Sequence, residues 1–370
     1  MRLTFLILTI TTLLPLAAED DVLDPLRRRL NADFTARLAD GPAYARRVDR
    51  DCAIFPEGRL YPFAFPAMAL ARSLSRDAER ADVQRQAIAT AIDLAIAATQ
   101  RQAGVADLAD LKDYARQGTW IGTLALALDA WPQAGGDDRY QALQAHCCDL
   151  LAAAIAERHG APIASYPALT WSFDTTVALA ALHAWDRRHG GERAVPLLRA
   201  HLAWLAARGC DADGLPRSEI QAGLADGPPR GCDLSWRITL LHGMDPDAAV
   251  ALYRRYHAAA WEERFAYAGF REYPRGYAGG ADLDSGPLVD GIGLTATGFG
   301  LAASRVCGDA ATYQRLAGQL ALLPQLRPAV LRLDPGAARV LEQFGNDADC
   351  VSGFLFGDAV CFYVLTWPGP

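Results

Sequence analysis

The sequence predicts an all-α protein built as an (α/α)6 toroid, a ring of six helical hairpins. First, apolar alanine-rich helices alternate along the chain with charged amphipathic ones. Second, the apolar helices begin near residues 60, 119, 174, 233, 286 and 351, and this spacing of about 50–70 residues is typical of a helical-hairpin repeat. Third, short turns rich in Gly and Asp lead out of the first five apolar helices, whereas the return connections are long.

In order, the apolar inner helices are expected over 60–74, 119–131, 174–185, 234–244, 286–306 and 351–367. The charged outer helices are expected over 78–102, 139–158, 192–208, 248–263 and 310–323. A sixth outer helix is supplied by 22–38, where leucine and phenylalanine recur every three to four residues. Packed against the last inner helix, it would close the ring. Short hairpins are expected in the long loops. The alternative is a stack of helices without a closed pocket.

The first 18 residues predict an export signal. Arg2 precedes the apolar run Leu3 to Leu16, and Ala17-Ala18 offers a small-residue cleavage site. An uncleaved membrane anchor is the alternative, but the run is shorter than the roughly 20 residues of a typical transmembrane helix. We therefore expect a single domain over 19–370, in a periplasmic or secreted protein.

Charge and cysteine content narrow the possible partners. The net charge is −7 and no basic patch is interleaved with aromatics, which argues against nucleic acid. Membrane contact is expected only if the N-terminal segment is retained.

Export permits disulfides among the eight cysteines, and the pairs Cys210–Cys232 and Cys52–Cys350 are predicted, with buried thiols as the alternative. For Cys232 a reactive thiol is a further alternative. No metal or other cofactor is expected, because the histidines and cysteines are not spaced along the chain as metal ligands are.

The long loops should gather on one rim, and they carry acids beside aromatics. Aromatic rings stack on sugar faces or cover an apolar chain, while polar groups bind hydroxyls. The residues expected to bind substrate are Tyr61, Tyr166, Trp171, Arg230, Trp236, Tyr273 and Asp282. Arg230 would clamp a carboxylate, either in a ligand or in the protein.

Three carboxyls are candidates for acid–base catalysis. Glu272, in Glu-Tyr-Pro, is the preferred acid. Asp174 is a possible acid or base, although a helix N-cap is favoured, as it is for Asp233. Asp284 lies two residues after Asp282 at the expected start of an inner helix, and a close carboxylate pair raises the pKa of one member. Capping and loop-fixing, or cation binding, are the alternatives for this pair.

Four segments resemble the linalool dehydratase-isomerase-like branch of six-hairpin proteins, an exported bacterial group. They are Trp171-Ser-Phe-Asp-Thr-Thr, Pro229-Arg-Gly-Cys-Asp-Leu-Ser-Trp, Arg271-Glu-Tyr-Pro-Arg-Gly and Asp282-Leu-Asp-Ser-Gly-Pro with Ala296-Thr-Gly. The resemblance covers roughly residues 165–310. It implies the (α/α)6 fold and, less directly, acid–base chemistry on a terpene alcohol, and it assigns no catalytic residue here.

The sequence thus predicts a cofactor-independent acid–base enzyme that hydrolyses a carbohydrate or cleaves it by elimination. In this scheme Glu272 or Asp284 protonates the leaving oxygen, and Asp174 is the opposing base. One alternative is a terpenoid-alcohol dehydratase or isomerase. Another is a non-catalytic envelope protein that binds a glycan or a partner protein.

Overall fold

The computed structural model describes residues 22–52, 55–74, 81–221, 224–225, 227–264, 267–282, 284–333 and 347–368. Within these ranges the protein is mostly helical, which confirms the predicted all-α class. The predicted export signal, residues 1–18, lies outside the described residues. Every helix in the described ranges is too short or too polar to span a bilayer.

Six helices in the described ranges carry apolar residues on nearly all sides. These inner helices are α4 (Tyr61–Ser73), α6 (Gly118–Leu128), α9 (Ser172–His189), α11 (Gly231–His242), α13 (Leu294–Val306) and α16 (Leu355–Leu365). In α4, for example, every residue except Arg72 is buried. A helix that is apolar on all sides must be covered on all sides.

The remaining long helices bury only one face. These outer helices are α2 (Asp24–Ala39), α5 (Ala81–Ala103), α8 (Gln141–Glu157), α10 (Ala194–Trp204), α12 (Pro246–Ala260) and α14 (Ala310–Leu333). In α8 the buried residues, among them Gln144, Cys147, Cys148 and Leu151, recur every three to four positions. This spacing places them on one side of the helix.

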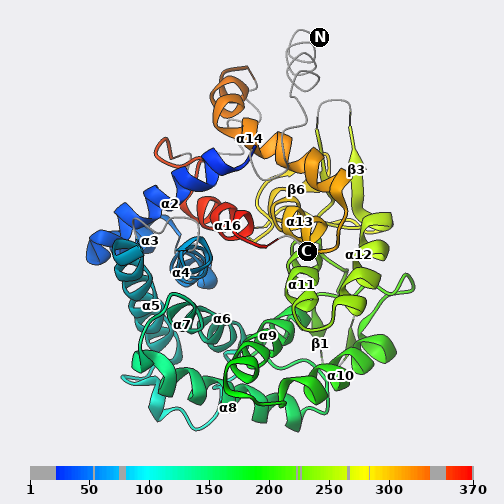
Figure 1. Ribbon diagram of the computed structural model, residues 1–370. Coiled ribbons are helices and arrows are strands. Elements are labelled where there is room, and N and C mark those ends of the chain that lie inside the picture. The colour runs from blue at the N-terminus through cyan, green and yellow to red at the C-terminus, as the bar shows by residue number, and fades with distance from the viewer. Residues whose placement is uncertain are drawn as a thin grey trace.

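Each inner helix contacts the next inner helix along the chain, and α16 contacts both α13 and α4. Each outer helix from α5 to α14 contacts the inner helix that precedes it, and α2 contacts α16, its predicted partner. Figure 1 shows these neighbours side by side. The core therefore lies between the inner helices and the outer helices that cover them.

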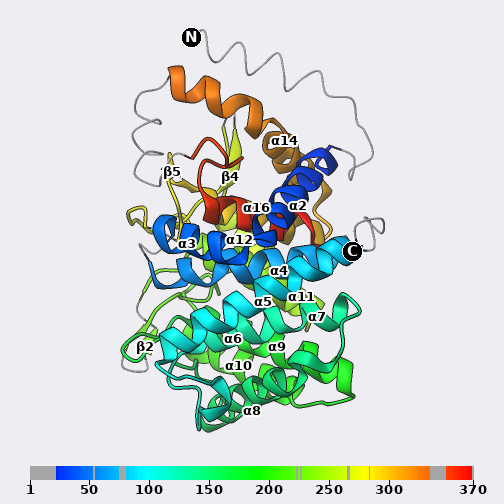
Figure 2. The ribbon, with the colours of Figure 1, turned by 90° about the vertical axis from the view of Figure 1, so that its left-hand side faces the viewer.

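Short antiparallel hairpins lie in the long connections, as predicted. They pair β1 (Ile220–Gln221) with β2 (Leu224–Ala225), β3 (Trp261–Glu263) with β4 (Ala268–Phe270), and β5 (Leu288–Val289) with β6 (Ile292–Gly293). In Figure 2, β2 and β5 lie on the left, whereas the short helix α7 (Ala130–Gln133) and the C-terminus lie on the right. The β1–β2 and β5–β6 hairpins thus lie at the end of the inner helices opposite the short turn at α7.

The predicted start of the fifth inner helix near residue 286 is wrong. α13 begins at Leu294, and the preceding residues form the β5–β6 hairpin. Gly286 and Gly291 have φ angles of +64° and +84°, in the left-handed region that interrupts a helix, and Pro287 supplies no N–H. Asp282 and Asp284 therefore do not cap a helix.

The predicted N-cap roles of Asp174 and Asp233 are also wrong. α9 begins at Ser172 and α11 at Gly231, so both aspartates lie inside the first helical turn. Their carboxyls accept hydrogen bonds from side chains on other segments, Thr119 for Asp174 and Ser218 for Asp233. Helix α3 (Gly41–Asp51) was not predicted at all.

The predicted disulfides Cys210–Cys232 and Cys52–Cys350 are not formed, because all eight cysteines are free thiols. The Cys232 thiol donates to Glu272 Oε1 at 3.1 Å. The Cys350 sulfur lies 3.7 Å from Arg47 Nη2. The thiols of Cys232 and Cys350 are therefore each packed against a polar group of the protein.

Gly231 allows the 271–272 segment to approach the start of α11. A Cβ at this position would lie 2.2 Å from the carbonyl oxygen of Arg271. We expect Gly231→Ala to lower the free energy of unfolding by about 2 kcal/mol, since the backbone must move. The matched control is Gly243→Ala, where the nearest atom is 3.5 Å from the added Cβ. Urea denaturation measures both, and equal stability of the two variants would contradict this account.

Candidate functional site

A pocket with about 640 Å³ of open space, counting its mouth, lies at the amino ends of the inner helices. It is lined by Glu57, Tyr61, Phe65, Thr119, Trp171, Phe173, Asp174, Ser218, Arg230, Cys232, Asp233, Trp236, Asp284, Thr295, Phe299 and Phe356. All six inner helices contribute to this lining. Many of the residues that were predicted to lie on the rim therefore line one pocket.

One wall of the pocket is aromatic. Trp236 stacks on Phe299 with ring centroids 5.0 Å apart, and its indole N–H donates to the Tyr363 hydroxyl at 3.3 Å. Tyr61 stacks on Phe65 at 4.8 Å. These packed rings form a fixed apolar surface for the non-polar part of a ligand.

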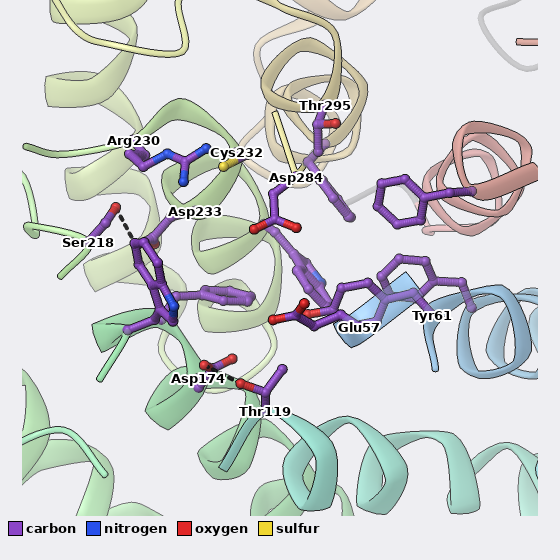
Figure 3. Close-up of a pocket in the computed structure, with 16 residues that line it drawn as sticks. Glu57, Tyr61, Thr119, Asp174, Ser218, Arg230, Cys232, Asp233, Asp284 and Thr295 are labelled. Carbon is purple, nitrogen blue, oxygen red and sulfur yellow. Dashed lines mark hydrogen bonds between the residues drawn. The ribbon is translucent and has the colours of Figure 1, made fainter. Parts of the chain in front are cut away.

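Three carboxyls from separate segments face the pocket. Glu57 lies in the short helical turn Pro56–Arg59 before α4, Asp174 lies in the first turn of α9, and Asp284 precedes the β5–β6 hairpin. Figure 3 shows the three carboxyl groups turned toward the same space. Thr119 donates to Asp174 Oδ2 at 2.6 Å, and the Tyr166 hydroxyl donates to Glu57.

The surroundings of these carboxyls favour their protonated forms. Burial, followed by the negative charges of Glu57 and Asp282, raises the pKa of Asp284 to about 7. Burial also raises the pKa of Asp174 to about 6, against hydrogen bonds from Ser165 and Thr119 that lower it. Burial raises the pKa of Glu57 as well, and the hydrogen bond from Tyr166 only partly offsets this. At neutral pH the pocket therefore holds protonated and ionised carboxyls together.

Arg230 holds the loop that carries Asp284. Its Nη2 donates to Asp282 Oδ1 at 2.9 Å, and the same oxygen accepts from the Ser285 backbone N–H at 2.8 Å. Burial alone would raise the pKa of Asp282, but Arg230 and these hydrogen bonds outweigh it and lower the pKa. The two aspartates therefore differ in charge state, with Asp282 ionised and Asp284 poised to be an acid.

Glu272 lies behind Arg230 and does not line the pocket. Its side chain is fully buried, and Oε1 accepts from Arg230 Nε at 2.8 Å. Oε2 accepts from the Cys232 backbone N–H at 3.2 Å. Burial raises the pKa of this carboxyl and Arg230 opposes the shift. Glu272 thus orients Arg230 and Cys232.

A second buried network supports the wall between α9 and α11. Arg237 is 1% exposed and donates Nε to Asp233 Oδ1 at 3.0 Å. It also donates to the hydroxyls of Thr176 and Ser172, each at 2.8 Å. Asp233 accepts from Ser218 at 3.1 Å, a bond drawn in Figure 3. Asp233 lines the pocket, but its charge is matched by Arg237.

Of the site residues predicted from the sequence, six line the pocket: Tyr61, Trp171, Asp174, Arg230, Trp236 and Asp284. The other four lie outside the lining. Glu272 and Asp282 bind Arg230, Tyr166 binds Glu57, and the Tyr273 hydroxyl donates to the Gly280 carbonyl at 3.2 Å.

The sequence did not single out Thr119 or the phenylalanines, it offered a reactive thiol at Cys232 only as an alternative, and it placed Glu57 on the rim without assigning it a role in the site. Glu57 had a usable signal, because Pro56-Glu57-Gly58 directly precedes an inner helix on the expected rim.

In the part of the chain that the structure describes, no group of three or more His, Cys, Asp or Glu side chains is arranged to hold a metal ion. No protein-family model matches the sequence, and a search of curated proteins finds no match either. We therefore infer the function from the geometry of the pocket.

Proposed function

We propose that the protein is a cofactor-independent acid–base enzyme that cleaves a C–O bond of a carbohydrate, by hydrolysis or elimination. One observation carries the proposal: Asp284 and Asp174 face one pocket from different segments, with pKa values raised to about 7 and about 6. Such values suit groups that exchange protons near neutral pH.

In this proposal protonated Asp284 donates its proton to the leaving oxygen as the C–O bond breaks. Ionised Asp174 accepts a proton, from an attacking water in hydrolysis or from carbon in elimination. Burial, and after it the nearby carboxyls of Glu57 and Asp282, favours the protonated form of Asp284, and Tyr166 orients Glu57 through a hydrogen bond. Arg230 and Glu272 are positioning residues, because they act on the loop that carries Asp284.

The mouth of the pocket supports a substrate with hydroxyl groups. The guanidinium of Arg230 lies 5.9 Å from the ring centroid of Trp171, so a cation stands beside a partly exposed aromatic ring. Asp282 presents a half-exposed carboxylate on the other side of Arg230. In sugar-binding sites an aromatic ring commonly stacks on one face of the sugar, and charged side chains bind its hydroxyl groups.

A terpenoid-alcohol dehydratase or isomerase is the second candidate, and the aromatic wall favours it. Phe65, Phe173, Phe299 and Phe356 all line the pocket, and they offer no hydrogen bond to a hydroxyl-rich ligand. A substrate with one oxygen and a hydrocarbon body would match that wall and still use Asp284 as the acid. We retain it as the alternative substrate class.

We further propose that the helices close into an (α/α)6 toroid, supported by the contact of α16 with α4 and of α2 with α16. Export to the periplasm or medium remains our proposal from the N-terminal 18 residues.

A substrate screen of the purified protein tests the proposed function. Neutral oligosaccharides, uronic-acid oligosaccharides and terpene alcohols are each incubated with the wild type, Asp284→Asn and Asp174→Asn. We expect turnover of a carbohydrate that both variants lose, while Asp213→Asn, an exposed control, keeps it. Turnover of a terpene alcohol alone would establish the second candidate. Binding without turnover in every class would identify a non-catalytic binding protein.

The pH dependence of kcat/KM is expected to be bell-shaped. Activity should fall below about pH 6, where Asp174 becomes protonated, and above about pH 7, where Asp284 loses its proton. Because the pocket carboxyls interact, the two limbs of the pH profile report the titration of the group together and not of either aspartate alone. Initial rates across pH 4–9 measure the profile. A plateau that extends unchanged to pH 9 would contradict the role of Asp284 as an acid.

A further inference from the structure

A second cavity lies at the carboxyl ends of the inner helices, opposite the proposed active site. It offers about 1130 Å³ of open space, counting its mouth. The same helices pass both cavities: Tyr61 and Phe65 of α4 line the first, Met68 and Arg72 the second. The second cavity is lined by Met68, Arg72, Leu126, Asp129, Gln133, Ala180, His183, Ala184, Arg187, Arg188, Leu240, Gly243, Met244 and Trp367.

The charged groups of this cavity are mainly cationic, with three arginines against one aspartate. Arg188 is matched, because its Nη2 lies 2.9 Å from Asp129 Oδ1. Arg187 has no ion-pair partner among the residues that the structure describes, and its guanidinium is exposed. Its charge reaches into the cavity, since burial and then Arg187 lower the pKa of His183.

Two buried donors of the cavity also have no acceptor within the described residues, Nη1 of Arg72 and Nε1 of Trp367. The two groups are adjacent: the Arg72 guanidinium lies 4.1 Å from the Trp367 ring centroid and 4.7 Å from that of Tyr363. A buried donor without a partner costs free energy that an acceptor atom of a ligand would recover.

Arginines near helix carboxyl ends also offset the partial negative charge of those ends. That effect is worth roughly half an elementary charge per helix end, so it reduces the positive field of the cavity. It supplies no acceptor for Arg72 and Trp367. Of the remaining lining, Gln133 and His183 are polar, and Met68, Leu126, Leu240 and Met244 form an apolar part.

We propose that this cavity binds an organic monoanion with an apolar body, such as a medium-chain carboxylate. The carboxylate pairs with Arg187 and with the partly exposed guanidinium of Arg72, while the hydrocarbon chain covers the methionines and leucines. This site is separate from the proposed active site and does not depend on its function.

Isothermal titration of the full-length protein with octanoate and octanol tests the proposal. We expect octanoate to bind and octanol, which has the same chain length but no charge, to bind at least tenfold more weakly. Arg187→Gln should weaken octanoate binding about tenfold. The control Arg199→Gln, on the exposed face of α10, should bind as the wild type does. Asp284→Asn should also leave octanoate binding unchanged.

Equal binding of octanoate and octanol, or unchanged octanoate binding in Arg187→Gln, would overturn the proposal. So would a changed octanoate affinity in Asp284→Asn, because the anion would then occupy the first pocket. Arg72→Gln provides a second variant, and its fold is checked by circular dichroism, since Arg72 also packs on Tyr363 and Trp367. Wild-type affinity in a folded Arg72→Gln would likewise contradict the assignment.

Discussion

Replacement of Asp284 by asparagine is expected to lower kcat about a hundredfold to ten-thousandfold on the substrate that the wild type turns over. The amide keeps the size of the side chain but has no acidic proton for the leaving oxygen. Steady-state kinetics of the wild type, Asp284→Asn and the exposed control Asp213→Asn measure the effect. A loss of less than threefold in Asp284→Asn would remove Asp284 from the mechanism.

The same variant has a stability signature that excludes misfolding as the cause. The pKa of Asp284 is raised from 3.8 to about 7 in the folded protein, so between these values the native state binds more protons than the unfolded state. Wild-type stability therefore falls as pH rises through this window. The asparagine side chain does not ionise and carries no such penalty, so Asp284→Asn should be more stable than the wild type at pH 8 and gain nothing at pH 3. Thermal unfolding at both pH values tests this.

Arg237→Met is expected to destabilise the protein by about 3–5 kcal/mol, the usual cost of removing one partner of a buried ion pair. The guanidinium is 1% exposed and makes hydrogen bonds to Asp233, Ser172 and Thr176. Without it, the buried carboxylate of Asp233 loses its cationic partner, and the hydroxyls of Ser172 and Thr176 each lose a hydrogen bond. Urea unfolding measures the loss, and Arg254→Met, on the exposed face of α12, should stay within about 0.5 kcal/mol of the wild type.

A double variant separates the unpaired charge from the lost packing. Asp233→Asn added to Arg237→Met removes the buried charge, so we expect the double variant to be more stable than Arg237→Met alone. If the second substitution destabilises further, the cost in the single variant arises from packing rather than from the charge.

The helical repeat was predictable because it depends on local patterns. Alanine-rich segments that are apolar on all sides and segments with one apolar face differ visibly in sequence, and α4 and α8 follow that difference. The start of α13 was not predictable from hydrophobicity, because Leu288, Val289 and Ile292 extend the apolar run into the segment before the helix. Two glycines with positive φ and a proline turn them into a hairpin instead.

The candidate site was predictable only in part. Asp174 and Trp236 could be placed near the rim because they lie in the first two turns of inner helices. The roles of Asp174 and Asp233 depend on Thr119, Ser218 and Arg237, whose proximity arises only from tertiary packing. The same holds for Glu57 and Asp284, which are distant in sequence but interact across the pocket.

The most direct test of the account is the titration of the aspartate carboxyls by NMR with ¹³Cγ-labelled aspartate, which needs no substrate. We expect one carboxyl that titrates near pH 7 and is absent from the spectrum of Asp284→Asn, and a second that titrates near pH 6 and is absent from that of Asp174→Asn. If every aspartate carboxyl titrates below pH 5, the pocket holds no acid for neutral pH and the proposed mechanism is contradicted.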